Sequence, residues 1–361
     1  MPDTLAATAA PRTGFHELTV AGIERLTDDA VAVTFAVADE LRAEFDFAAG
    51  QSLTLRRVLD GVEHRRTYSI CAPVGEPPRI GVREIPDGLF SSWLVREVRP
   101  GDVIEVQSPG GSFAADPATG ARHLCIAAGS GITPMLSIAA SVLDNPASQV
   151  TLLYGNRTST SVMFAEELAD LKDAHRERFG LVHVLSREPR DVDLFTGRLD
   201  ADRLRDLLTA IVPVGDLDHV WLCGPFGMLE DARTVLAELG VAAERIHFEL
   251  FFVDEPPPQL RHADRVVDGA TSEVTVTLEG RSTTTAMPLD QTILDSAQEV
   301  RSDLPFACKG GVCGTCRAKV CDGEVDMVRN YALTPDEVAA DFILTCQTFP
   351  VGPAVTVDFD A

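Results

Sequence analysis

Four cysteines near the end of the chain have the spacing of metal ligands. Cys308, Cys313, Cys316 and Cys346 follow the pattern C-x4-C-x2-C-x29-C, which is the ligand spacing of a plant-type [2Fe–2S] cluster. The first three share a loop that contains three glycines, where the backbone can wrap closely and direct amide N–H groups at sulfur. The pattern therefore predicts one-electron transfer as the chemistry of this region.

Zinc is the main alternative, because four thiolates also suit a tetrahedral Zn²⁺ site. Zinc sites usually pair their cysteines in two short knuckles, whereas here three cysteines share one loop and the fourth lies far downstream. Disulfides are disfavoured, since such a loop does not space its Cβ atoms for bridging. The other four cysteines are scattered and are expected to be small buried hydrophobes. They are Cys71, Cys125, Cys223 and Cys321.

Two segments in the first third of the chain have residues that suit a flavin. In Arg66-Thr67-Tyr68-Ser69, the arginine can neutralise pyrophosphate, the tyrosine can stack on the isoalloxazine ring and the serine can hydrogen-bond the reactive ring nitrogen. In Gly88-Leu89-Phe90-Ser91-Ser92, the serines are predicted to cap a helix whose first amides face phosphate. Val82-Arg83 could add main-chain contacts. An ordinary strand and an ordinary helix cap are equally compatible with each segment alone.

Two further segments suit a nicotinamide dinucleotide. Gly129-Ser130-Gly131-Ile132-Thr133-Pro134 follows an apolar strand and opens a helix, although it is not the G-x-G-x-x-G fingerprint. Cys223-Gly224-Pro225 ends another apolar strand, at the carboxyl end of a sheet, where open α/β folds bind ligands. Phe251 could cover the flavin face that awaits nicotinamide. A tight turn, a buried thiol and a core phenylalanine are the alternatives to these three interpretations.

The segments between the motifs differ in their hydrophobic period. Residues 14–116 hold short alternating stretches broken by turns, at 30–37, 52–58, 67–71, 79–83 and 103–107, which predicts an antiparallel β-barrel that binds the flavin. Residues 117–253 alternate apolar strands at 124–128, 150–154, 181–185 and 220–223 with helical stretches. That alternation predicts a parallel sheet covered by helices, which forms the nicotinamide domain.

A linker and a small third domain are predicted to follow. Residues 254–271 contain three successive prolines, which cannot continue a helix or a central strand. Residues 272–361 begin with an alternating strand and a Glu279-Gly280 turn, so we expect a β-hairpin. Helical spacing predicts a helix over 288–300, and Thr334-Pro335-Asp336-Glu337 has the residues of another helix start. The domain with the cysteines is therefore expected to be α+β.

The composition limits the partners of this 361-residue chain. It has 55 acidic and 31 basic residues, for a formal charge of −24, which disfavours nucleic acid and anionic membranes and is compatible with a basic protein partner. No stretch reaches the roughly 18 apolar residues of a membrane span. Residues 1–13 lack the basic start and apolar run of a signal peptide. The predicted location is the cytoplasm.

The order of the motifs is more specific than any one of them. From Phe15 onward the chain resembles the ferredoxin–NADP⁺ reductase superfamily with a fused C-terminal ferredoxin, because Arg66–Ser69, Gly129–Pro134, Cys223–Pro225 and the cysteine pattern follow in that order. Tyr154-Gly155-Asn156-Arg157 and Phe248-Glu249-Leu250-Phe251 are most similar to the reductase subunits of phenylacetyl-CoA epoxidases. The reductases of ketosteroid 9α-hydroxylases come second.

This resemblance implies a fold, three cofactors and a direction of electron flow. The third domain would be a β-grasp ferredoxin, and electrons would pass from NAD(P)H through FAD and the [2Fe–2S] cluster to an oxygenase component. Tyr68, Ser69 and Cys223 would line the point of hydride transfer. Arg157, with Arg187, could meet a 2′-phosphate, which favours NADPH over NADH. A cluster-based redox sensor and a reductase with no dedicated partner remain the rival classes.

Overall fold

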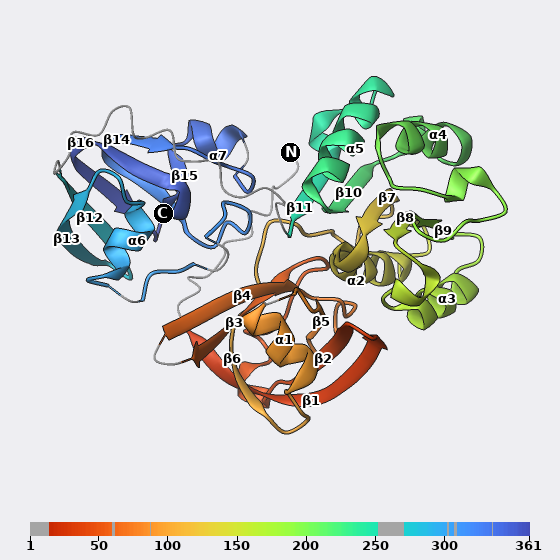
Figure 1. The fold of residues 1–361 in the computed structure, drawn as a ribbon, viewed down its shortest axis with the longest axis horizontal. Helices are drawn as coiled ribbons and strands as arrows, with labels where there is room; N and C mark the ends of the chain where they lie inside the picture. The colour runs from red at the N-terminus through yellow and green to blue at the C-terminus, as the bar shows by residue number, and fades with distance from the viewer. Residues whose placement is uncertain are drawn as a thin grey trace. The chain divides into compact units, whose positions relative to one another are not determined.

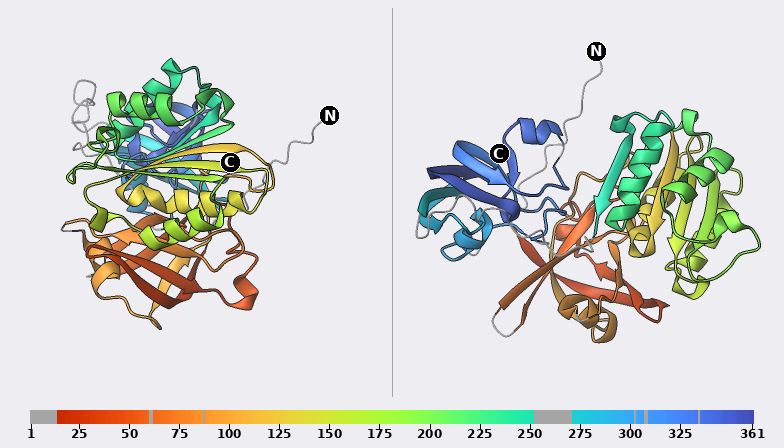
Figure 2. Two further views of the ribbon diagram at one scale, coloured as in Figure 1. Left: turned by 90° about the vertical axis from the view of Figure 1, so that its right-hand side faces the viewer. Right: turned by 45° about the horizontal axis from the view of Figure 1, so that its top comes forward.

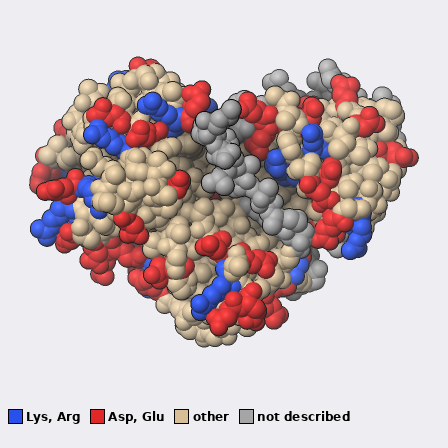
Figure 3. Space-filling view, turned by 180° about the vertical axis from the view of Figure 1, so that it is seen from behind, with Lys and Arg blue, Asp and Glu red and all other residues tan. Residues whose placement is uncertain are grey.

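The computed structural model describes residues 14–361 except 60–61, 87, 252–270, 302, 307–308 and 334, and the chain forms two compact units (Figure 1). The first comprises Leu18–Ile104 and Pro109–Pro258, and the second is made mainly of Gln259–Ala361. The predicted linker over 254–271 lies outside the described residues except for its last position. Acidic side chains are spread over the face drawn in Figure 3, as the charge of −24 requires.

The first unit begins with a six-stranded sheet in the order β4-β3-β6-β1-β2-β5. The β1–β2, β2–β5 and β3–β4 pairs are antiparallel. The edge strands meet again because Ile70 bridges Ile80 and the Cys71 N–H donates to the Arg79 carbonyl at 2.8 Å. This closure confirms the predicted barrel. The strands are β1 (Phe15–Thr27), β2 (Ala30–Ala36), β3 (Ser52–Leu59), β4 (Val62–Ser69), β5 (Arg79–Arg83) and β6 (Val103–Gln107).

The helix of the barrel starts earlier than the sequence predicted. Helix α1 spans Leu89–Arg96, and its N-cap is Gly88, without a side-chain hydrogen bond. Ser91 and Ser92 lie inside the helix, so the prediction that they cap it was wrong. The Ser91 hydroxyl instead accepts from the Ile85 N–H at 3.1 Å, and it thereby fixes the loop that precedes the helix.

The rest of the first unit is a parallel sheet in the order β11-β10-β7-β8-β9. All four neighbouring pairs are parallel, as predicted, and helices lie on both faces of the sheet (Figure 2, left). The strands are β7 (Arg122–Ala128), β8 (Gln149–Asn156), β9 (Phe179–Leu185), β10 (His219–Gly224) and β11 (Ile246–Leu250). The helices are α2 (Ile132–Leu143), α3 (Ala165–Ala174), α4 (Ala201–Ile211) and α5 (Phe226–Glu238).

The second unit is a mixed sheet in the order β13-β12-β16-β14-β15. The predicted hairpin joins β12 to β13 through Glu279 and Gly280, whose φ angles are 53° and 67°. The predicted helix over 288–300 is shorter, because Pro288 ends β13 and Thr292 caps the helix by accepting from the Asp295 N–H. The elements are β12 (Thr271–Leu278), β13 (Arg281–Pro288), α6 (Ile293–Gln298), β14 (Arg317–Met327), α7 (Pro335–Ala339), β15 (Phe342–Leu344) and β16 (Thr348–Asp358).

Two remaining predictions concern the burial of Cys321 and the start of helix α7. Cys321 is exposed, so its predicted burial was wrong, because β14 has a register shift between Val320 and Asp322 that leaves Cys321 without a partner position. Helix α7 begins at Pro335 as predicted, and Thr334 lies outside the described residues. None of the helices that the structure describes has the length and apolar character to cross a bilayer.

Candidate functional site

The parallel sheet reverses its strand order between β7 and β10, which is where such folds bind nucleotides, beyond the carboxyl ends of the strands. After β7 comes the 3₁₀ turn η2 (Gly129–Gly131) and then α2, and after β10 comes Pro225 and then α5. Neither helix has a side-chain cap. The Ile132 N–H at the start of α2 donates to the Gly129 and Ser130 carbonyls. The dipoles of both helices favour an anion at their N-termini, which fits a dinucleotide pyrophosphate.

The glycines of this edge are required by close contacts. A Cβ atom on Gly131 would lie 2.1 Å from the Cys223 carbonyl oxygen, so the turn after β7 packs directly on the end of β10. Gly129 has a φ of 56°, and its carbonyl accepts from the Tyr154 hydroxyl at 2.9 Å. The two predicted nicotinamide motifs thus form one surface, as expected from the sequence.

Ser69 connects the flavin motif to this surface. Its hydroxyl donates to Glu249 Oε2 at 2.8 Å, and Glu249 is the register partner of Cys223 in the β10–β11 pair. Burial raises the pKa of Glu249 to about 7, against the opposing effect of the Ser69 hydrogen bond. Burial and, second, the Glu249 charge raise the pKa of the fully buried Cys223 thiol, so the thiol is neutral.

Glu249 is the candidate functional residue that sequence reasoning missed. It stands within the Phe248–Phe251 segment, and no sequence pattern links it to a serine 180 positions earlier. The available signal was a carboxylate in a parallel strand beside the Cys223 strand. Phe251 packs partly buried against the core that includes Cys223, and its predicted contact with a flavin stays a prediction.

The flavin motif lies on β4, with an exposed arginine and a sheltered aromatic ring. Arg66 is exposed, so its guanidinium can reach a phosphate. The ring of Tyr68 lies 6.2 Å from that of Phe90 and is tilted by 40°, and burial raises the pKa of Tyr68 against the effect of Arg66. The Thr67 hydroxyl is occupied by Thr54 at 3.1 Å. The motif fits an anionic, aromatic cofactor near the start of α1.

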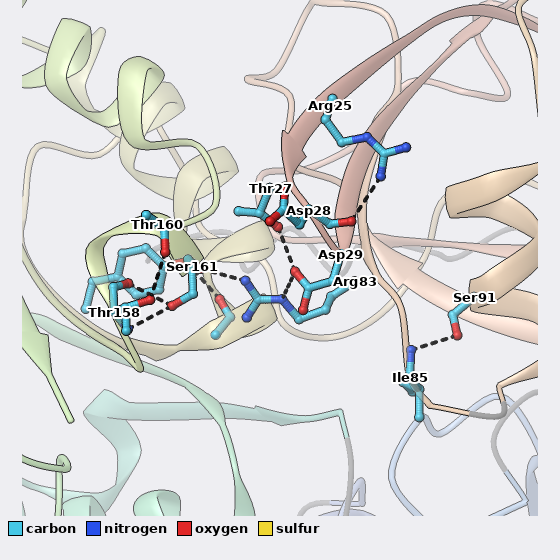
Figure 4. Close-up of polar contacts among 12 residues, drawn as sticks. Arg25, Thr27, Asp28, Asp29, Arg83, Ile85, Ser91, Thr158, Thr160 and Ser161 are labelled. Carbon is cyan, nitrogen blue, oxygen red and sulfur yellow. Dashed lines mark hydrogen bonds and ion pairs between the residues drawn. The ribbon is translucent and has the colours of Figure 1, made fainter. Parts of the chain in front are cut away.

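Arg83 is directed at the nicotinamide segments rather than at α1. Its Nη2 donates to the Ser161 carbonyl at 2.6 Å and its Nε pairs with Asp29 at 3.3 Å (Figure 4). Its Nη1 lies 3.3 Å from where a Gly129 Cβ would be. Val82 is buried in β5 opposite Val31. Arg83 therefore lies where it could contact either nucleotide.

The other predicted nucleotide-binding residues divide into buried and exposed groups. Ile132, Thr133 and Pro134 are buried in the first turn of α2, so they position the turn without presenting side chains to a ligand. Arg157 and Arg187 are exposed at the ends of adjacent strands, and the Arg187 N–H donates to the Arg157 carbonyl at 2.8 Å. The two guanidinium groups thus start from neighbouring points on the nucleotide edge.

The described cysteines of the predicted cluster lie in the second unit, in and opposite a strained loop. Lys309, Gly311 and Gly314 have positive φ angles of 51°, 80° and 66°. The Cys316 carbonyl accepts from the Thr345 N–H at 3.1 Å and from its hydroxyl at 3.0 Å. These bonds hold Cys346 beside Cys316.

The thiols of Cys316 and Cys346 are neighbours. A hydrogen bond to Cys346, then burial and the Cys346 and Cys313 charges raise the pKa of the Cys316 thiol. No three His, Cys, Asp or Glu side chains in the described part of the chain are gathered tightly enough to hold a metal ion, and Cys308, the fourth predicted ligand, lies outside that part. The donor set and the glycine loop fit an iron–sulfur cluster.

Comparison with known proteins identifies all three parts. The chain matches an oxidoreductase FAD-binding domain over residues 17–114, an oxidoreductase NAD-binding domain over 125–234 and a 2Fe-2S iron-sulfur cluster binding domain over 276–351. These matches confirm the predicted FAD, nicotinamide and [2Fe–2S] cofactors. They also decide against zinc at the cysteines, and the two oxidoreductase domains favour an enzyme over a redox sensor.

Relatives match the chain along nearly its whole length. It is 44% identical over 355 residues to a 1,2-phenylacetyl-CoA epoxidase subunit of Escherichia coli K12, covering 97% of this chain and 99% of the relative. It is 33% identical over 352 residues to the ferredoxin reductase component of 3-ketosteroid-9-alpha-monooxygenase of Rhodococcus rhodochrous, covering 95% and 96%. The structure of phthalate dioxygenase reductase shares its fold, with a TM-score of 0.61 at 24% identity and coverage of 96% and 98%. The chain therefore belongs to the family of flavin and iron–sulfur reductases that pass electrons from nicotinamide to oxygenases.

Proposed function

We propose that this chain is the reductase component of a phenylacetyl-CoA epoxidase and that it draws its electrons from NADPH. The observation that carries this proposal is the 44% identity to a subunit of such an epoxidase, which extends over 97% of this chain and 99% of the relative. The ketosteroid reductase component is 33% identical over a similar span. The epoxidase is therefore the better supported partner.

Different residues of the first unit bind the nucleotide, bind the flavin and line the point where the two cofactors meet. FAD, when bound, takes two electrons as a hydride, and the cluster takes electrons singly. The N-termini of α2 and α5 orient the pyrophosphate of the nucleotide, and Gly131 allows the turn after β7 to pack against Cys223. Together the buried Ser69 and Cys223 and the half-buried Glu249 form a packed wall at the meeting point. Tyr68 and Arg66 retain the flavin.

Glu249 is the one group at this wall that can gain or lose a proton near neutrality. Since burial raises its pKa to about 7, it is mostly protonated below that pH and mostly ionised above it. The Ser69 hydroxyl donates to it, and this bond is stronger to the carboxylate than to the acid. Glu249 therefore sets the orientation of the Ser69 hydroxyl in a pH-dependent way.

The preference for NADPH rests on two exposed arginines. Arg157 and Arg187 leave the sheet at the ends of β8 and β9, joined by a backbone hydrogen bond of 2.8 Å. Two guanidinium groups from adjacent positions suit a phosphate monoester. Replacing both by glutamine should raise the KM for NADPH and leave that for NADH nearly unchanged.

The domain bounds of this proposal are 14–116 for the flavin domain, 117–253 for the nicotinamide domain and 272–361 for the ferredoxin domain, with a linker over 254–271. Apart from the capping role of Ser91 and Ser92, the site residues named from the sequence keep their predicted roles as proposals, with Glu249 added. The cluster ligands would be Cys308, Cys313, Cys316 and Cys346. A cytoplasmic location stays a prediction of the sequence.

Reconstitution with purified oxygenase components tests the proposal. The protein loaded with FAD, iron and sulfide should support substrate-dependent NADPH oxidation with the oxygenase component of a phenylacetyl-CoA epoxidase and phenylacetyl-CoA. The same reductase is assayed in parallel with the oxygenase component of a ketosteroid 9α-hydroxylase. Turnover with the steroid system alone would reverse the choice of partner. Rapid NADPH oxidation that neither oxygenase accelerates would favour a reductase without a dedicated partner.

A further inference from the structure

Strand β5 of the flavin barrel packs directly on the nicotinamide-binding half of the same unit. Arg79, Gly81 and Arg83 share one face of this strand, because side chains alternate along a strand. A Cβ on Gly81 would lie 2.5 Å from Thr133 Cγ2 and 2.8 Å from Phe164 Cζ. Thr133 belongs to the nucleotide turn and Phe164 precedes α3. The middle of the strand thus has no room for any side chain.

Arg79 makes a forked ion pair at the start of this strand. Its Nη1 and Nη2 donate to the two carboxylate oxygens of Glu167, each at 2.8 Å. Nη2 also donates to Glu24 of β1 at 2.7 Å. The Arg79 side chain is 17% exposed and that of Glu167 is 35% exposed. Bidentate geometry and partial burial distinguish this pair from an ordinary surface ion pair.

The partner residues are themselves held in place. Glu167 lies in the first turn of α3, where a carboxylate is favoured by the helix dipole. The guanidinium carbon of Arg79 lies 5.3 Å from the ring centroid of Phe164, which is buried and has a φ of 58°. Arg79 therefore contacts both the N-cap and the first turn of the same helix.

The backbone of Arg79 leads back to the flavin motif. Its carbonyl accepts from the Cys71 N–H at 2.8 Å and from the Cys71 thiol at 3.2 Å. Cys71 is two residues beyond Ser69, the residue that meets Glu249. The main chain of Arg79 thus contacts the segment after the flavin motif, and its side chain contacts α3.

We propose that Arg79 is a positioning residue for hydride transfer, acting through Glu167. The inference rests on the proposed reductase function. The pair fixes the angle between the barrel and the parallel sheet, so that a nucleotide bound at Gly129–Gly131 reaches the flavin beside Ser69. A misplacement of about 1 Å between reacting groups costs on the order of a hundredfold in rate. Arg79 itself touches neither cofactor in this role.

The test compares Arg79→Met, Arg79→Lys, Glu167→Gln and the Arg79→Met/Glu167→Gln double variant in NADPH–ferricyanide reduction. We expect Arg79→Met and Glu167→Gln each to lower kcat by about tenfold or more, while the KM for NADPH changes less than about threefold. The double variant should be no slower than Arg79→Met alone, because both changes break one interaction. Arg79→Lys should recover part of the rate, since it keeps the charge without the fork.

A matched control is available inside the nicotinamide half. Arg205 pairs with Glu238 at 2.8 Å and Asp202 at 3.1 Å, and both partners lie in that half, so Arg205→Met should leave kcat unchanged. Equal FAD content and melting temperature establish that each variant is folded, and the near-isosteric Glu167→Gln covers a failure of Arg79→Met to fold. An active wild type with unchanged Arg79→Met and Glu167→Gln variants overturns the inference. A wild type that does not oxidise NADPH overturns the proposed function instead.

Discussion

Gly131→Ala tests the geometry of the nucleotide edge with a single methyl group. The added Cβ would lie 2.1 Å from the Cys223 carbonyl oxygen and 2.5 Å from its carbonyl carbon. An ordinary contact is about 3.5 Å, so the overlap exceeds 1 Å. Both obstacles are backbone atoms, which cannot rotate away as a side chain can. The turn and the end of β10 must therefore separate by about 1 Å.

Two consequences of that separation can be measured. Overpacking of this kind destabilises a protein by about 1–3 kcal/mol, which should lower the melting temperature of the first unit. A shift of about 1 Å at the nicotinamide site should lower kcat for NADPH–ferricyanide reduction by about a hundredfold. FAD content should stay at one per chain, because Arg66 and Tyr68 lie on β4 and are not moved by the new methyl group.

The control is the same substitution where the structure has space. A Cβ on Gly215 would have no atom within 4 Å, and the residue has no positive φ, so Gly215→Ala should match the wild type in both assays. Stopped-flow measurement of flavin bleaching by NADPH separates hydride transfer from later electron steps. A Gly131→Ala variant that bleaches at the wild-type rate would refute the proposed contact between the turn and Cys223 as a determinant of the site.

Three further changes probe the rest of the electron route. Cys313→Ser should abolish cytochrome c reduction while ferricyanide reduction, which needs only the flavin, persists; equal loss of both would contradict the order FAD then cluster. Tyr68→Ala should weaken flavin retention, seen as FAD lost on gel filtration. Burial raises the pKa of Glu249 to about 7 from 4.5, so the folded state loses up to about 3 kcal/mol as pH rises from 4.5 through 7. Glu249→Gln should flatten that decline in melting temperature between pH 5 and 8, and an unchanged slope would count against a buried acid.

The sequence predicted the fold best where the alternation of residues was regular. The expected strands at 79–83 and 103–107 coincide with β5 and β6. Strand β1 over Phe15–Thr27 was not predicted, because its burial alternates only in its first half and no residue from Ala21 to Leu26 is buried. The start of α1 was misplaced since serine is a strong capping residue, whereas here Gly88 takes that position and Ser91 serves the loop.

The site was predictable only to the extent that it is local in sequence. The flavin motif, the glycine turn and Cys223-Gly224-Pro225 could each be recognised from neighbouring residues. The Ser69–Glu249 contact could not, because it joins residues 180 positions apart through the pairing of β10 with β11. The same holds for Arg79 and Glu167, which are 88 positions apart. Neither pair leaves a pattern in a window of sequence.

Contacts between the two nicotinamide motifs explain why their order along the chain is more informative than either motif alone. Gly131 is required by the Cys223 carbonyl. A Cβ on Gly224 would lie 2.6 Å from Met228 Cε of α5 and 3.3 Å from Ala128 at the end of β7. Gly131 is thus required by the other motif, whereas Gly224 is required both by the helix that follows it and by the end of β7. Motifs that are weak alone become specific together, since the packing of β7 against β10 links them.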